Sequence, residues 1–253
     1  MSAEIDQLVA RMERLLAPLE ATADPRRHFL ATYLRTTRAV AGEIDRGGFD
    51  DRAWVERWDV VFAELYLDAV EQHTRGETPS APWATAFRAA TDRPDLPMLR
   101  HLLLGMNAHI NYDLPQALLA VIPSADFDDP ALMARREADH RHVDDVLVAR
   151  VEAEDRELQA AGVPRSLLDR VLTPLNKTGT KRFLQEARAK VWANTRALDG
   201  ARRTGPTAYA GRLAELESLS AARIADLTAP GQVLLKLAVG GFGVRLPAAS
   251  QSR

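Results

Sequence analysis

Residues 96–121 of the chain read LPMLRHLLLGMNAHINYDLPQALLAV, and this stretch decides the fold. Leucine and methionine occupy every side of a helix in its first half, which is typical of a helix buried all round. Its second half carries four polar residues at alternate positions, namely Asn107, His109, Asn111 and Asp113. Polar groups inside a core cost free energy unless they are paired or used. The stretch therefore predicts a central helix, at about residues 97–113, that holds a site inside a helical bundle.

Apolar residues recur at three- and four-residue spacing along most of the remaining chain, and no convincing length has the two-residue alternation of a strand. We therefore predict an all-α fold, a single-domain multi-helix bundle that covers residues 1–253. Its core spans residues 25–227, and an apolar tail interrupted by glycines follows at residues 230–253. A capping-box pattern predicts a short helix at residues 166–172, and residues 177–180 are expected to form a turn.

Composition argues against several classes of protein. Lys and Arg total 33 against 35 Asp and Glu, a formal net charge of -2, so no basic excess favours nucleic acid. The chain has no cysteine, which excludes disulfides and thiolate metal sites. The apolar run at residues 233–239 is interrupted by Lys236 and is too short to span a bilayer. We expect a cytoplasmic protein with no transmembrane segment, whose partner is a small-molecule ligand or substrate; a homodimer is an open alternative.

His109 and Asp113 lie four residues apart, which places both side chains on one face of a helix. This spacing is used for metal clamps and for an imidazole oriented by a carboxylate, so both residues are candidate catalytic groups. The alternative is structural, because Pro115 should kink or restart the helix. Asp113 would then be an N-cap, with Gln116 completing a capping box. Asn107 and Asn111, on the same helix, are candidate substrate-binding residues.

A second cluster, DHRHVDD, lies at residues 139–145, where His140 and Asp144 repeat the four-residue spacing. A solvated charged face is one interpretation of such a run. The other is a divalent metal site for zinc or iron, in which imidazole and carboxylate groups are the ligands. The candidate ligands are His109, Asp113, His140 and Asp144.

Asp68 is a third candidate catalytic residue, because it follows the aromatic residues of the helix that contains Trp58, Phe62 and Tyr66. A carboxylate beside aromatic rings can have a raised pKa and act as an acid. It can equally pair with an arginine, and Arg188 is one candidate partner. Tyr33, Tyr66 and Arg188 complete the candidate substrate-binding residues.

The segment GMNAHINYDLPQAL, at residues 105–118, resembles the core motif of a bacterial family, the domain of unknown function 5995. The resemblance covers most of residues 25–200. It includes an F-x-x-x-Y-x-x-x-T helix (Phe29, Tyr33 and Thr37) and an F-x-x-L-Y-x-D-A segment (Phe62, Leu65, Tyr66, Asp68 and Ala69). It also includes a W-x-x-x-F turn (Trp83 and Phe87) and a D-x-x-x-V-N element (Asp139 and Val143). This chain has Asp144 where the last element has Asn. The resemblance implies an all-α fold and a residue pattern, without a reaction.

A looser similarity links the two H-x-x-x-D pairs to the helical zinc-dependent phospholipase C and nuclease group, as an analogy. The chain lacks that group's N-terminal Trp.

Three functional hypotheses follow from these residues. The first is a small-molecule enzyme with a pocket floored by His109, Asn111, Asp113 and Asp68. It would be a metal-dependent hydrolase, or His109 would act alone as a general acid or base. The second is a non-catalytic binding protein for an apolar or amphipathic small ligand, closed by the tail at residues 233–242. In the third, the polar row only links helices through buried hydrogen bonds.

Overall fold

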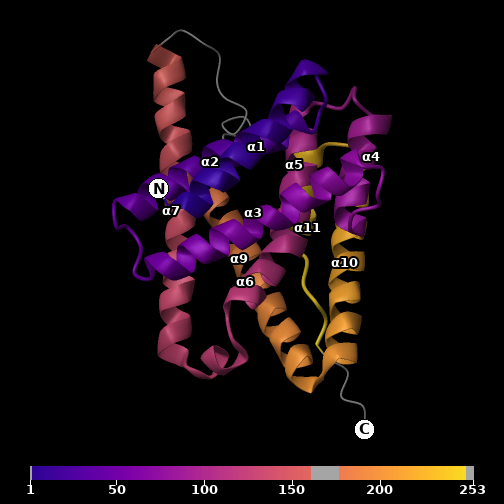
Figure 1. Cartoon of the computed structure of the whole chain (residues 1–253). Coiled ribbons are helices and arrows are strands. Elements are labelled where there is room, and N and C mark those ends of the chain that lie inside the picture. The colour runs from indigo at the N-terminus through magenta and orange to yellow at the C-terminus, as the bar shows by residue number, and fades with distance from the viewer. Residues whose placement is uncertain (1, 161–176, 249–253) are drawn as a thin grey trace.

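The computed structural model describes residues 2–160 and 177–248, and within these residues all regular secondary structure is helical (Figure 1). The all-α prediction is confirmed. Residues 177–180 do not form the expected turn, because they are the first turn of a helix. The predicted helix at residues 166–172 lies outside the described residues. The α-helices are α1 (Ala3–Ala21), α2 (Arg27–Asp45), α3 (Arg52–Thr74), α4 (Ala81–Asp92), α5 (Met98–Ala108), α6 (Leu114–Val121), α7 (Pro130–Ala160), α9 (Lys177–Thr204), α10 (Pro206–Thr228) and α11 (Val233–Gly240).

Carboxylate side chains hold the start of α3. Asp51 accepts from the backbone N–H of Trp54 at 3.0 Å and caps α3. Asp139, on α7, accepts from the backbone N–H groups of Asp50 and Asp51 at 2.8 and 2.9 Å. The start of α3 is therefore fixed both by its own cap and by a carboxylate from a helix far away in the sequence.

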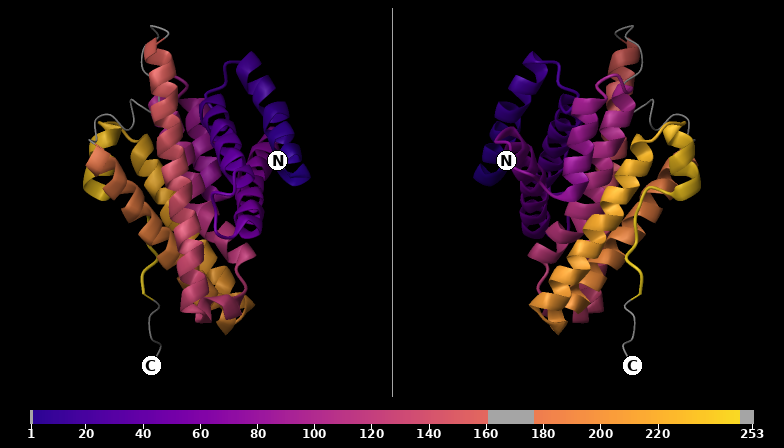
Figure 2. Two further views of the ribbon diagram at one scale, coloured as in Figure 1. Left: turned by 90° about the vertical axis from the view of Figure 1, so that its left-hand side faces the viewer. Right: turned by 90° about the vertical axis from the view of Figure 1, so that its right-hand side faces the viewer.

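The helix that contains the opening stretch lies between two groups of helices. Figure 2 shows the N-terminal helices α1 to α3 on one side of it and the C-terminal helices α9 to α11 on the other. α2 and α4 pack on α5, while α3 and α9 pack on α6. None of the described helices combines the length and hydropathy that crossing a bilayer requires.

The α-helical pattern of the central helix is interrupted before Pro115 and restarts there, as predicted: α5 ends at Ala108, and α6 runs from Leu114 to Val121 with Pro115 in its first turn. A single π-turn, His109–Asp113, joins α5 to α6, and the backbone N–H of Leu114 donates to the carbonyl of His109. The widened turn allows a proline within a continuous helix, since the missing N–H and the bulky ring fall where the α-helical ladder is already interrupted. The predicted capping box is wrong, because the Asp113 side chain makes no cap bond and Gln116 donates instead to the carbonyl of Tyr112 at 2.8 Å.

The tail after α11 crosses the central helix in an extended conformation, and asparagine side chains bind its backbone. The amides of Asn107 and Asn111 both donate to the carbonyl of Phe242 at 3.1 Å, and Asn111 accepts from the N–H of Val244 at 3.0 Å. Asn194, on α9, donates to the carbonyl of Val244 and accepts from the N–H of Leu246. These amides replace the neighbouring strand that an extended backbone would otherwise need.

Candidate functional site

His109 and Asp113 form a buried pair inside the π-turn. His109 Nδ1 lies 2.9 Å from Asp113 Oδ2, and the same oxygen accepts the indole N–H of Trp83, on α4, at 2.8 Å. Both side chains are at most 4% exposed. A carboxylate held by a second donor fixes the orientation of the imidazole. Asp113 is therefore a positioning residue for His109.

Aromatic rings enclose His109. The ring of Phe62, on α3, stacks on the imidazole with centroids 3.6 Å apart and an interplanar angle of 4°. Tyr33, on α2, meets it edge-on at 4.6 Å. Three further rings lie with centroids within 6.1 Å, those of Phe29, Tyr66 and Trp83. We call His109, Asp113 and these five aromatic residues the His109 cage.

Burial controls the protonation of the pair. Desolvation lowers the pKa of His109, and the hydrogen bond and charge of Asp113 oppose that shift. Desolvation also raises the pKa of Asp113, opposed by its hydrogen bonds from His109 and Trp83. The imidazole is therefore held in its neutral form near neutral pH, with a free lone pair or N–H at the other nitrogen.

Three polar atoms of the cage have no hydrogen-bond partner among the described residues, and all three are buried. They are His109 Nε2, the Tyr33 hydroxyl and the Tyr66 hydroxyl. Nearly all buried polar groups in proteins are hydrogen-bonded, so such atoms require an explanation. The two nitrogens of an imidazole point in nearly opposite directions, which means that Nε2 faces away from Asp113.

Further unpartnered polar groups continue from Tyr33 into the interior. Asp59, on α3, is 5% exposed, and its Oδ2 has no partner among the described residues. Burial raises the pKa of Asp59 to about 7. Burial raises the pKa of Tyr33, and the charge of Asp59 raises it further. Thr37, one turn after Tyr33, is fully buried, and its hydroxyl has no partner in the described part of the chain. We call Tyr33, Thr37 and Asp59, together with His109 Nε2, the interior polar group.

Sequence reasoning missed Asp59. The signal was available, because Asp59 falls four residues after Val55 and four before Ala63, both buried. A carboxyl group in the middle of an apolar helix face is a buried group.

The structure does not bring Asp68 to this site. Asp68 is 58% exposed and pairs with Arg11 at 2.7 Å on the outer side of α3. Tyr66, which contributes to the cage, is two residues earlier, and positions two apart on a helix face different directions. Asp68 therefore belongs to a surface ion pair, and the predicted pocket floor lacks it.

The remaining candidate substrate-binding residues divide between the cage and other contacts. Tyr33 and Tyr66 lie in the cage. Asn107 and Asn111 are bonded to the tail, as described above. Arg188, on α9, pairs with Asp144.

The four candidate metal ligands do not gather in the described residues. His109 lies against Phe62, whereas His140 lies against Trp58 at 5.1 Å, and Trp58 and Phe62 stack on each other between them. Asp144 is in the ion pair with Arg188. Within the described ranges, no three His, Asp or Glu side chains come together as a metal site would need. The donor set does not fit the zinc or iron site, and no step is derived through a metal.

The fold and the site define a helical bundle that encloses a histidine–carboxylate pair in an aromatic cage. The chain belongs to the family of unknown function DUF5995, whose model matches residues 5–230. The resemblance to that family is confirmed. Comparison with curated proteins and with solved structures gave no match, and the analogy to zinc-dependent phospholipase C stays an analogy.

Proposed function

We propose that this protein is an enzyme of a small molecule, in which His109 Nε2 exchanges a proton with the substrate and Asp113 positions the imidazole. One observation carries the proposal: Nδ1 is fixed by a buried carboxylate, while the equally buried Nε2 has no partner among the described residues. A histidine that only links helices would use both nitrogens, because an unpaired buried polar atom costs about 1–3 kcal/mol.

The protonation states suit general base catalysis. A neutral imidazole accepts a proton at Nε2, and the Asp113 carboxylate stabilises the imidazolium that forms. Hydroxyl donors from Tyr33 and Thr37 would face charge that develops on the substrate. Asp59, with a pKa of about 7, holds or releases a second proton close to neutral pH. The substrate would occupy the side of His109 that carries the interior polar group.

A binding protein without catalysis is the second candidate. The observation that favours it is the ring stacked 3.6 Å from His109, since a flat contact with Phe62 restricts the approach of a substrate to the imidazole. In that case the interior polar group would fix the polar end of an amphipathic ligand. Hydrolysis, a cytoplasmic location and a homodimer stay predictions.

A ligand screen followed by a turnover assay tests the proposal. Mixtures of small metabolites are screened by the thermal shift they cause, and each hit is followed by NMR for conversion. His109→Gln should keep binding the hits and lose conversion by about 10²-fold or more. His142→Gln is the control, because His142 lies on α7 in a partly exposed contact with Glu43. Hits that bind to both proteins and are never converted support the binding protein instead.

A further inference from the structure

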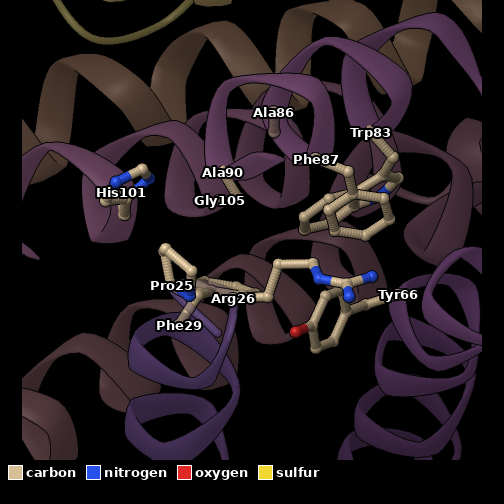
Figure 3. A pocket seen from close by; sticks show the side chains of 10 residues that line it. All are labelled: Pro25, Arg26, Phe29, Tyr66, Trp83, Ala86, Phe87, Ala90, His101 and Gly105. Carbon is tan, nitrogen blue, oxygen red and sulfur yellow. The ribbon is translucent and has the colours of Figure 1, made fainter. Parts of the chain in front are cut away.

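The recess that borders the His109 cage at Phe29, Tyr66 and Trp83 has a volume of about 20 Å³, room for about one water molecule (Figure 3). The chain's own tail, in contrast, is bound along its length by side chains of the bundle. Figure 1 shows this tail, residues 241–248, in yellow after the end of α11. We call the side chains that bind its backbone the tail clamp; they are Asn107, Asn111, Lys190, Asn194, Arg212 and Arg223.

The asparagines of the clamp recognise backbone, not side chains. Asn111 donates to the carbonyl of Phe242 at 3.1 Å and accepts from the N–H of Val244 at 3.0 Å. Asn194 repeats this pairing two residues later, with the carbonyl of Val244 at 3.0 Å and the N–H of Leu246 at 2.9 Å. Among the described residues, no backbone–backbone hydrogen bond holds this part of the tail. The amides therefore serve an extended chain as a neighbouring strand would.

Basic side chains of the clamp bind further carbonyls of the tail. Lys190, on α9, donates to the carbonyl of Gly243 at 2.8 Å, and Arg223, on α10, donates to that of Gly241. These donors lie on α9 and α10, whereas Asn111 lies on the central helix. The clamp therefore grips an extended backbone from three helices at once.

The side chains of the tail alternate between buried and exposed positions. Phe242 and Leu246 are at most 5% exposed, whereas Arg245 is exposed. A Cβ at Gly243 would lie 2.7 Å from Cδ of Lys190, so a side chain there would push the lysine away. Main-chain bonds give an extended segment its affinity, and pockets for alternate side chains give it specificity. The clamp therefore prefers a large apolar residue, then glycine, then an apolar residue three positions after the glycine.

The tail is joined to the bundle by a short glycine link. Gly240 and Gly241 connect it to α11, and Gly241 has a φ of 72°. α11 itself is held by Val233 and Leu237, which are at most 9% exposed. Rotation at the glycine link allows the tail to leave the clamp while α11 stays packed. The family match, residues 5–230, contains the three asparagines and excludes the tail. Clamp and occupant are thus separate parts of the chain.

We propose that the tail clamp is a binding site for an extended segment of a partner protein with this apolar–glycine pattern, and that the chain's own tail fills the clamp until the partner displaces it. Asn111 lies in the π-turn that contains His109, so the occupant of the clamp contacts the turn of the proposed catalytic pair. The partner site does not depend on the proposed reaction.

Fluorescence anisotropy with a labelled peptide, GGFGVRLPA, the sequence of residues 240–248, tests the site. The full-length Phe242→Ala variant loses the anchor of its own tail and should bind the peptide with a Kd of about 10–100 μM. The wild type should bind about tenfold more weakly or less, because its tethered tail competes at an effective concentration of about 1 mM. Val244→Pro, which removes the N–H that Asn111 accepts, serves if Phe242→Ala does not fold.

Matched variants show whether the peptide enters the clamp. Asn194→Ala, added to Phe242→Ala, removes two hydrogen bonds to the occupant and should weaken peptide binding about tenfold or more. Gln7→Ala, an exposed amide on α1, is the control and should change nothing. A peptide with Arg245→Ala should bind like the parent, because this side chain is exposed. A peptide with Phe242→Ala should bind at least about tenfold more weakly.

The proposal is overturned if neither tail variant binds the peptide saturably up to about 1 mM. It is also overturned if Asn194→Ala leaves the affinity unchanged, or if the parent peptide and the peptide with Phe242→Ala bind equally. Sedimentation of the wild type tests the other occupant. A dimer at micromolar concentration that Asn194→Ala dissociates would assign the clamp to a second copy of this chain, in place of a partner protein.

Discussion

Trp83 Nε1 donates to Asp113 Oδ2 at 2.8 Å, across the interface between α4 and the π-turn. The same oxygen holds His109. A carboxylate with two donors is stabilised in its charged form even though burial opposes that form. The indole therefore contributes to packing and also to the electrostatics of the pair.

Trp83→Phe should destabilise the fold by more than the loss of packing alone. The phenyl ring fills part of the same space, but Asp113 loses one of its two donors inside the core. Loss of a hydrogen bond to a buried charged group costs about 1.5–3 kcal/mol. Urea denaturation measures this difference. Trp192→Phe is the matched control, because the Trp192 indole N–H is buried and has no partner among the described residues; equal losses for the two variants would contradict the role given to Trp83.

Asp59→Asn should stabilise the protein in a pH-dependent way. The pKa of Asp59 is about 7 in the folded chain and has an ordinary value of 3.8. The stability that this proton supplies is therefore complete below about pH 3.8 and is lost as the pH rises to about 7. Asparagine has no such proton to lose, so the advantage of the variant should grow over that window and then level off.

The measurement for Asp59→Asn is urea denaturation at intervals from about pH 4 to pH 9, since one pKa unit corresponds to about 1.4 kcal/mol. We expect a gain of roughly 2–4 kcal/mol at the alkaline end relative to the acid end. Asp68→Asn, on the exposed side of the same helix, is the control. A difference that stays constant across the range would show that Asp59 is already charged or paired in the folded state.

The stretch at residues 96–121 shows which features of the fold the sequence predicts and which it does not. Leucine on every side of residues 96–106 predicts burial, and Leu102, Leu103 and Leu104 are at most 1% exposed. The four-residue spacing predicts that His109 and Asp113 share a face, and the two side chains are in contact. Pro115 correctly predicted the restart of the helix, but not the helical turn before it, because the rule that proline ends a helix assumes an α-helical ladder. A π-turn before the proline already interrupts that ladder, so the helix can continue through the proline. No residue type predicts a π-turn.

The sequence alone could not predict which distant residues the polar row binds. The carbonyl that Asn107 and Asn111 bind belongs to Phe242, more than 130 residues later. An alternating polar row looks the same whether its members bind a ligand or a distant stretch of backbone. Only the fold, which brings the tail across the central helix, distinguishes the two.

Asn111→Ala should release the tail. The change removes a donor to Phe242 and an acceptor for the N–H of Val244, and buried backbone groups without partners cost about 1–3 kcal/mol each. Hydrogen exchange of residues 241–246 should rise at least tenfold at the Val244 amide. Asn107→Ala is the comparison, because Asn111 still serves the carbonyl of Phe242 in that variant, so a smaller rise is expected. Unchanged exchange in both variants, together with altered ligand binding, would support the original prediction that these asparagines bind substrate.

Gly105→Ala should weaken the packing of α2 on the central helix. A Cβ at position 105 would lie 2.6 Å from Cγ of Phe29, closer than any real contact, so the Phe29 ring must move. Phe29 packs against Tyr33, Tyr66 and Trp83, and overpacking of such a core costs about 1–3 kcal/mol. Gly200→Ala, in α9, is the matched control because a Cβ there meets nothing within 4 Å. Alanine has the better helix propensity, so that variant should gain up to about 1 kcal/mol in urea denaturation. A gain in both variants would mean that Phe29 can move without loss, and the aromatic cage around His109 would then be less rigid than the contacts of its rings indicate.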